Sequence, residues 1–75
     1  MMTTLLAPEI VTVDELNDRC DSCGAAARIE VTLTSGGTLA FCGHHGNRYA
    51  AELIPLASKV ALEKDYEWAG RVPTA

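Results

Sequence analysis

Residues 20–45 read CDSCGAAARIEVTLTSGGTLAFCGHH, and this stretch decides the fold. It opens with the pair Cys20-x2-Cys23 and closes with the pair Cys42-x2-His45, and eighteen residues separate the two pairs. Two ligands three positions apart on a tight turn or a first helical turn can reach one ion, and two such pairs complete tetrahedral coordination. The spacing is typical of a paired-knuckle zinc site. We therefore predict that Cys20, Cys23, Cys42 and His45 bind a structural Zn²⁺ ion.

Other roles for the three cysteines fit the sequence less well. An odd number of cysteines in a chain without a recognisable signal peptide does not suggest a disulfide framework. Free cysteines are often simply buried, but burial alone does not set them at ligand spacing. A thioredoxin-like redox pair would be followed by a helix, whereas an alternating apolar strand follows Cys23 here. Metal binding is the better interpretation.

The second ligand pair leaves a choice between two adjacent histidines, because Cys42-x-His44 is also conceivable. In a helix, His45 shares one face with Tyr49 and Leu53, which must pack against the rest of the domain. His44 lies on the neighbouring, polar face. We therefore expect His45 to be the ligand and His44 to lie at the surface or just outside the ligand shell.

The residues around the site suggest how it is supported. Gly24 can adopt the positive φ that turns backbone amides toward the sulfurs, and Gly43 is expected to do the same for the second pair. Three thiolates and a neutral imidazole give a zinc site a formal charge of −1, which Arg19, Arg28 and Arg48 can offset. The alternative is that these arginines are ordinary solvated side chains.

A β-hairpin is predicted between the two ligand pairs. Residues 27–33 alternate apolar and polar side chains with the two-residue period of a half-buried strand. The sequence Ser35-Gly36-Gly37 supplies the turn, and we predict a three-residue loop with Gly37 in a left-handed conformation. This loop length places the apolar residues on one face. It opposes Leu33 to Leu39 and Val31 to Phe41.

The elements outside the hairpin are less distinctly marked. Residues 43–54 have a helical period, and Pro55 is expected to end or kink that helix. Residues 59–64 are predicted as a third strand, the alternative being a helix that continues over residues 56–62. Thr12 and Glu15 form a capping-box pattern that predicts a helical turn over residues 13–18, unless the acidic residues there are only a solvated face.

The size of the chain allows one small domain. It has 75 residues, and we divide it into a flexible N-terminal arm (residues 1–11), a single zinc-finger domain (12–64) and a C-terminal tail (65–75) from which Trp68 can fold back. A core of this size seldom supplies more than roughly 3–5 kcal/mol of stability, whereas structural zinc contributes roughly 10–16 kcal/mol. We therefore expect folding to depend on the metal.

Charge and hydropathy exclude several classes of protein. The formal net charge of −4 argues against a general binder of nucleic-acid backbones. No apolar stretch approaches the roughly 20 residues needed to cross a bilayer, and the start of the chain lacks the pattern of a signal peptide. We expect a cytoplasmic protein with no membrane partner.

A knuckle, a hairpin and a helix that carries the second ligand pair describe a small α+β fold, and residues 18–54 resemble the treble-clef zinc finger. A zinc ribbon is the near alternative. The motifs DRCDSCGAAA (residues 18–27), SGG (35–37) and FCGHH (41–45) are similar to those of a family of short uncharacterised proteins from actinobacteria and their phages. The resemblance implies a zinc-bound module and brings no established activity.

The functional expectation is a small non-enzymatic regulator. Four protein ligands leave no open position on the metal for water or substrate, which argues against an enzyme. We expect an adaptor that docks on another protein through spare apolar groups at both ends of the chain, and the resemblance makes a phage one candidate origin of the adaptor. A nucleic-acid-binding zinc finger in transcription or replication is the alternative, and self-association through the hairpin edge is a third.

Overall fold

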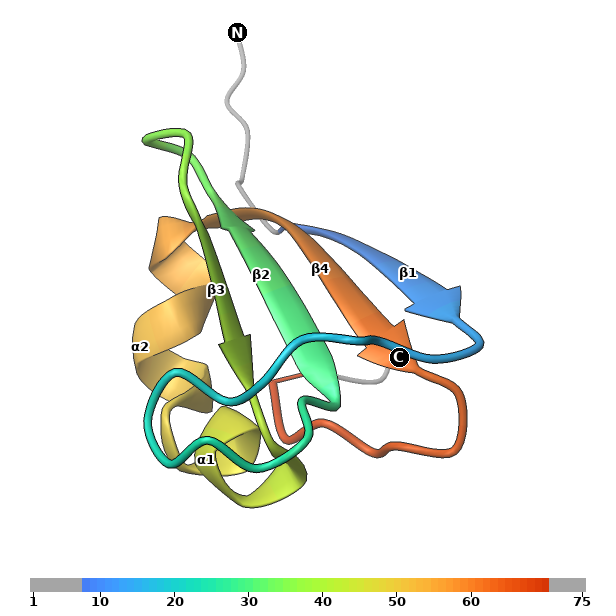
Figure 1. Cartoon of the computed structure of the whole chain (residues 1–75). Helices are drawn as coiled ribbons and strands as arrows, with labels where there is room; N and C mark the ends of the chain where they lie inside the picture. The colour runs from blue at the N-terminus through green and yellow to red at the C-terminus, as the bar shows by residue number, and fades with distance from the viewer. Residues whose placement is uncertain (1–7, 71–75) are drawn as a thin grey trace, which may run out of the picture.

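The computed structural model of the chain describes residues 8–70, which form a small α+β fold (Figure 1). Its mixed sheet has four strands in the order β1-β4-β2-β3. The strands are β1 (Glu9–Val13), β2 (Ile29–Leu33), β3 (Thr38–Phe41) and β4 (Ala57–Glu63). The helices are α1 (Gly43–Arg48), α2 (Ala50–Leu53) and the 3-10 helix η1 (Ile54–Leu56). None of the helices described is both long and apolar enough to cross a membrane.

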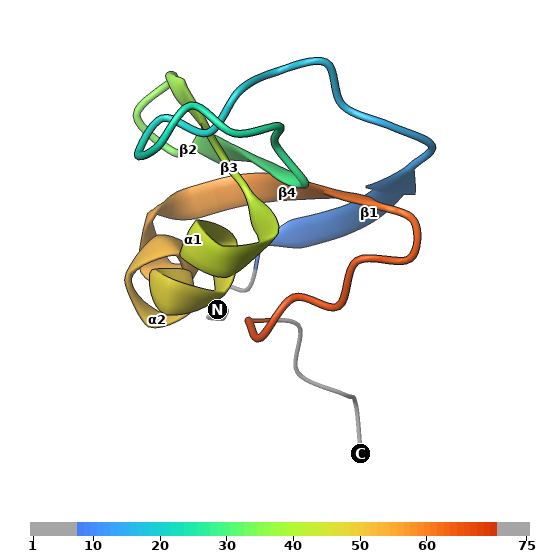
Figure 2. The ribbon, with the colours of Figure 1, turned by 60° about the horizontal axis from the view of Figure 1, so that its bottom comes forward.

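The hydrophobic core lies between the helices and one face of the sheet. The helices pack on one side, and the segment joining β1 to β2 crosses the other side (Figure 2). The largest fully buried side chains come from the two central strands and share the sheet face that the helices cover, because side chains alternate between faces and these residues pair across β2 and β4. They are Ile29, Val31, Val60 and Leu62.

The predicted hairpin is confirmed, but its loop lies one residue earlier than expected. The Leu33 N–H donates to the Gly37 carbonyl oxygen at 2.8 Å, which leaves residues 34–36 as a three-residue loop. Gly36, and not Gly37, takes the positive φ, at 113°. The last residue of a three-residue hairpin loop is the one that adopts such a conformation, so the glycine requirement moves with the loop.

The hairpin register therefore differs by two residues from the predicted one. Val31 lies opposite Leu39, and Phe41 lies opposite Ile29. A shift of two residues keeps every side chain on its original face, because side chains alternate with a period of two. The requirement that apolar side chains share one face excludes a register shifted by one residue, but it does not distinguish the predicted register from the observed one.

The strand predicted near the end of the domain is confirmed and becomes central. β4 pairs antiparallel with β2 and parallel with β1, so it lies between them. The alternative of a helix over residues 56–62 is wrong, since only Leu56 belongs to a helical element and the rest is strand. The predicted kink is present, because Pro55 lies in η1 at the point where α2 ends.

The helix expected over residues 43–54 is interrupted. Tyr49 has φ −100° and ψ 10°, outside the helical region, and it separates α1 from α2. The chain changes direction there, so that α1 stays near the cysteines while α2 packs its buried residues Ala50 and Leu53 on the sheet. Because of this break, residues 43–53 can contribute to the cysteine–histidine cluster through α1 and to the hydrophobic core through α2.

The first strand corrects two expectations about the N-terminal part. Residues 9–11, which the sequence analysis placed in the arm, belong to β1 and pair with β4. Residues 13–18 form no helical turn, because Thr12 lies within β1 and cannot cap a helix. Pairing with a strand about fifty positions away outweighs the local capping signal. The rest of the arm, residues 1–7, lies outside the described residues.

Part of the expected C-terminal tail folds back on the domain. Trp68 is only 3% exposed, and Tyr66 packs against the core. The option that Trp68 returns to the core is thus confirmed. Residues 71–75 of the tail lie outside the described part of the chain.

Truncation of a core leucine should have a far larger effect than truncation of a surface leucine. Leu62 is 1% exposed, so Leu62→Ala should lower the free energy of unfolding of the metal-loaded protein by about 2–5 kcal/mol. Leu56 is 52% exposed, and Leu56→Ala should change it by no more than about 0.5 kcal/mol. Urea unfolding followed by circular dichroism measures both. Equal losses in the two variants would show that β4 is not part of the core.

Candidate metal centre

The four predicted ligand side chains meet at one point of the fold. Cys20 and Cys23 lie on the turn that precedes β2, Cys42 follows β3 directly, and His45 lies in the first turn of α1. Their potential ligand atoms all lie within 4.8 Å of one another. We call these four residues the Cys3His quartet. They could bind a metal ion.

The distances within the quartet fit a tetrahedral ion. The Sγ atoms of Cys23 and Cys42 are 3.8 Å apart, and His45 Nδ1 lies 3.4 Å from Cys42 Sγ and 3.6 Å from Cys20 Sγ. Zinc bonds of about 2.3 Å to sulfur and about 2.0–2.1 Å to nitrogen place tetrahedral sulfurs about 3.8 Å apart and a sulfur and a nitrogen about 3.6 Å apart. The quartet therefore has the dimensions of such a shell.

The first pair lies on a tight turn closed by backbone hydrogen bonds. The Gly24 N–H donates to the Cys20 carbonyl at 2.8 Å, and the Cys20 N–H donates to the Ala25 carbonyl at 2.7 Å. Gly24 has φ 83°, so the positive φ predicted there is present. The Ser22 N–H points at Cys20 Sγ, 3.4 Å away. Backbone donors of this kind stabilise a thiolate.

This turn is fastened to the edge of the sheet by Asp21. The Asp21 N–H donates to the Ala40 carbonyl at 2.8 Å, and the Ala40 N–H donates to Asp21 Oδ2 at 2.8 Å. Ala40 belongs to β3, two residues before Cys42. Asp21 thus fixes the distance between the two ligand pairs.

The second pair uses the start of a helix. Cys42 is the N-cap of α1, and its sulfur accepts from the His45 N–H at 3.5 Å. Gly43 does not have the positive φ that we expected, because it is the first residue of α1. Its lack of a side chain matters in another way: a Cβ there would lie 3.2 Å from Tyr66 Cε1.

The structure brings His45, and not His44, into the quartet. The His45 ring stacks on Tyr49 with centroids 5.8 Å apart and planes at 17°, and Tyr49 in turn meets Phe41 edge to face at 5.6 Å. His44 is exposed and touches the quartet only through an edge-to-face contact with His45. The face shared by His45 and Tyr49 thus packs toward the sheet, as the helical period predicted.

The thiols differ in how readily they ionise. Burial raises the pKa of Cys20, but backbone donors, first that of Cys42, outweigh it and lower the pKa to about 6. The backbone of Ala25 lowers the pKa of Cys23, yet partial burial and the neighbouring thiols raise it overall. Ionisation of neighbouring sulfurs at this spacing is mutually unfavourable, and a divalent cation among them would remove that repulsion.

The three arginines near the site differ in their surroundings. Arg28 Nε lies 2.6 Å from Glu63 Oε1, so the charge of Arg28 is matched by a carboxylate outside the quartet. Arg19 and Arg48 are exposed. The alternative that they are solvated side chains fits them better.

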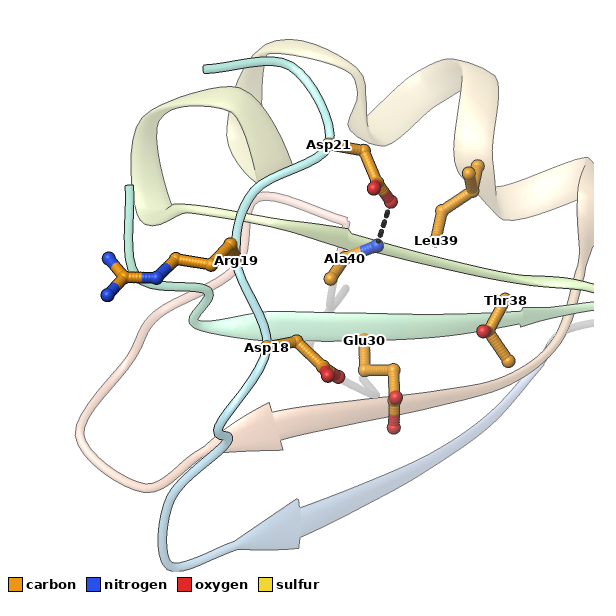
Figure 3. Close-up of a pocket in the computed structure, with 7 residues that line it drawn as sticks. All are labelled: Asp18, Arg19, Asp21, Glu30, Thr38, Leu39 and Ala40. Atoms are coloured by element: carbon orange, nitrogen blue, oxygen red, sulfur yellow. Dashed lines mark hydrogen bonds between the residues drawn. The ribbon is translucent and has the colours of Figure 1, made fainter. Parts of the chain in front are cut away.

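A separate open pocket lies beside the turn of the first pair (Figure 3). Its volume is about 370 Å³, and it contains none of the quartet. A hydrogen bond to Asp18 and partial burial raise the pKa of Glu30. The third carboxylate of the lining, Asp21, is committed to Ala40. The pocket is lined by Asp18, Arg19, Asp21, Glu30, Thr38, Leu39 and Ala40.

The residues that hold the quartet in place were not predicted from the sequence. Asp21 links the two pairs, and Tyr66 and Trp68 form hydrogen bonds to α1. Asp21 lies within the first motif and offers a carboxylate beside a strand edge, which is a usable signal. The contacts from residues 66 and 68 join positions about twenty residues apart, and no local pattern announces them.

Comparison with known proteins places the chain in a family. Residues 14–66 match the model of a family described as Domain of unknown function (DUF7455). The chain belongs to this family. The matched residues include the whole Cys3His quartet. No curated protein and no solved structure matches the chain significantly.

The two adjacent histidines provide a matched test of the quartet. His44→Ala should leave one tetrahedral metal ion per chain, whereas His45→Ala should weaken binding by more than the roughly 10–100-fold typical of outer-shell changes. Cobalt titration followed by visible absorption measures stoichiometry and geometry together. Comparable losses in both variants would mean that the histidine assignment is wrong.

Proposed function

We propose that the chain is a small non-enzymatic protein in which Zn²⁺, held by the quartet, stabilises a surface that binds another protein. The observation that carries the metal assignment is the set of sulfur and nitrogen distances in the quartet. Three thiolates and one imidazole in a tetrahedral arrangement suit zinc better than the harder cations, which prefer oxygen ligands.

A structural role for the metal fits the ligand set. Four protein ligands saturate a tetrahedral zinc ion, so no position is left for a water molecule or substrate. Among residues 8–70, the quartet is the only group of three or more His, Cys, Asp and Glu side chains that could hold one metal ion. These two points support a protein without catalytic metal chemistry.

We also propose that the site is of the treble-clef kind. The order of elements supports this: the turn with Cys20 and Cys23, the β2–β3 hairpin, and then α1 with the second pair. α1 is short, however, and β1 and β4 extend the sheet beyond the usual finger. The cytoplasmic location and the actinobacterial or phage origin stay predictions from the sequence.

The sheet edges support a protein-binding role. At the β3 edge, Asp21 occupies the backbone groups of Ala40, which makes self-association through the hairpin edge less favourable. At the other edge, the Lys64 N–H donates to the Val13 carbonyl, so by alternation the peptide groups of Ile10 and Thr12 point away from β4. β1 contains no lysine, proline or bulge of the kind that protects edge strands. A partner can add an extended strand there.

Nucleic-acid binding receives less support. The net charge is −4, and Arg28, one of the three arginines near the site, is paired with Glu63. The remaining positive charge is too dispersed for a backbone-binding patch.

Removal of the metal should unfold the domain. Zinc contributes roughly 10–16 kcal/mol in finger-type peptides, against roughly 3–5 kcal/mol from a core of this size. Treatment with a chelator, or the substitution Cys23→Ser, should abolish the cooperative thermal transition seen by circular dichroism. Ser22→Ala, next to Cys23, is the control and should retain it. A metal-free chain, verified by elemental analysis, that melts as the loaded chain does would contradict the proposal.

Partner binding should depend on the free edge of β1. Thr12→Pro removes an outward-facing N–H that β4 does not use, and proline is tolerated at such edge positions. Thr12→Val is the matched control, since it keeps that N–H. Quantitative copurification from the host should recover a stoichiometric partner with the wild-type and Thr12→Val chains and lose it, by about tenfold or more, with Thr12→Pro. Equal recovery with both variants would exclude β1 as the binding edge, and sedimentation would reveal a second copy as the partner.

A further inference from the structure

Residues 64–70, which we call the return segment, leave the end of β4 and run back to α1. Figures 1 and 2 both show this orange to red segment passing beside α1. Tyr66 packs against the core, and Trp68 is 3% exposed. The segment thus lies against the helix that carries half of the quartet.

Three hydrogen bonds join the return segment to α1. Trp68 Nε1–H donates to the Gly46 carbonyl at 2.8 Å, and the Ala69 N–H donates to Asn47 Oδ1 at 2.7 Å. The Tyr66 hydroxyl donates to the Gly43 carbonyl at 2.9 Å and lies 3.1 Å from Asn47 Oδ1. The last carbonyls of a short helix lack intrahelical donors, so the indole of Trp68 supplies a bond that α1 cannot make for itself.

The packing between α1 and the return segment leaves no free space at Gly46. A Cβ there would lie 2.8 Å from the Tyr66 hydroxyl oxygen and 2.7 Å from Ile29 Cγ2. The helix is therefore held between β2 on one side and Tyr66 on the other. Burial raises the pKa of Tyr66 to about 12, with a contribution from Cys42 and an opposing one from Arg28, so the hydroxyl is a donor at neutral pH.

α1 itself has few means of fixing its position. It is six residues long, and Gly46 is its one buried residue. Yet Cys42 is its N-cap and His45 lies in its first turn, so any rotation of α1 moves two of the four ligand atoms relative to Cys20 and Cys23. The contacts made by the return segment restrict that rotation.

We propose that Tyr66 and Trp68 are positioning residues of the metal centre, and that docking of the return segment and metal binding favour each other. The inference rests on the proposed metal site. Coupling of this kind is reciprocal. If docking of the segment raises the metal affinity by some factor, metal binding raises the equilibrium constant for docking by the same factor. Outer-shell contacts of comparable kind change metal affinity by roughly 10–100-fold.

The two tyrosines of the chain allow a matched test. Tyr66→Phe removes only the hydroxyl that contacts α1, and it should weaken Zn²⁺ binding about tenfold or more in a competition titration. Tyr49→Phe removes the same atom from the ring that stacks on His45 and should change affinity less than threefold. A Tyr66→Phe chain with wild-type affinity would overturn the inference.

A loss of affinity through general destabilisation has to be separated from positioning. Leu62→Ala provides that comparison, because it weakens the core in β4 but removes none of the hydrogen bonds between α1 and the return segment. At saturating Co²⁺, the visible absorption bands of Leu62→Ala should match those of the wild-type chain, whereas those of Tyr66→Phe should shift. Identical saturated spectra in all three chains would overturn the positioning role.

The reciprocal effect can be read from the single tryptophan, Trp68. In the Zn²⁺-loaded wild-type chain, its emission should be blue-shifted and poorly quenched by acrylamide, and Tyr66→Phe should increase quenching at full metal occupancy. Unchanged quenching in that variant would contradict the coupling. If the wild-type chain bound no metal at all, the proposed function would fail first, so the two failures are distinguishable.

Discussion

The turn with Cys20 and Cys23 meets α1 at the Cys3His quartet. The way in which these two segments are held on the sheet depends on the quartet. The fully buried large side chains all belong to β2 and β4, so the sheet has its own apolar core. The turn with Cys20 and Cys23 contributes only one buried side chain, and α1 contributes only Gly46. Apolar burial therefore gives these two segments little stability. A metal ion in the quartet would join them more strongly than their packing does.

The sequence predicted the parts of the fold that depend on local spacing. The ligand pairs, the alternation over residues 27–33 and the break at Pro55 all appear where expected, because each needs only neighbouring residues. β1 was missed because its partner is β4, and the capping pattern of Thr12 and Glu15 pointed to a different local structure. The hairpin register was wrong by two residues because both registers bury the same side chains.

The quartet could be predicted for a similar reason, and its supports could not. Ligand spacing and the helical face of Tyr49 were enough to choose His45 over His44. The contacts of Asp21, Tyr66 and Trp68 depend on the final course of the backbone, which brings distant segments together. The sequence also offered Arg28 as a positive charge that could offset the charge of the zinc site. In the structure, Arg28 pairs instead with Glu63 at the end of β4, a partner that no local pattern indicates.

The parallel pairing of β1 with β4 has a consequence for the order in which the chain folds. Glu9 and Lys59 are partners, so closing this ladder fixes a loop of about fifty residues and has a correspondingly large entropic cost. The four ligands, in contrast, are all synthesised by residue 45. During translation, the four ligand side chains thus become available to an ion before β4 does, and β1 must wait, unpaired, for β4 to be synthesised.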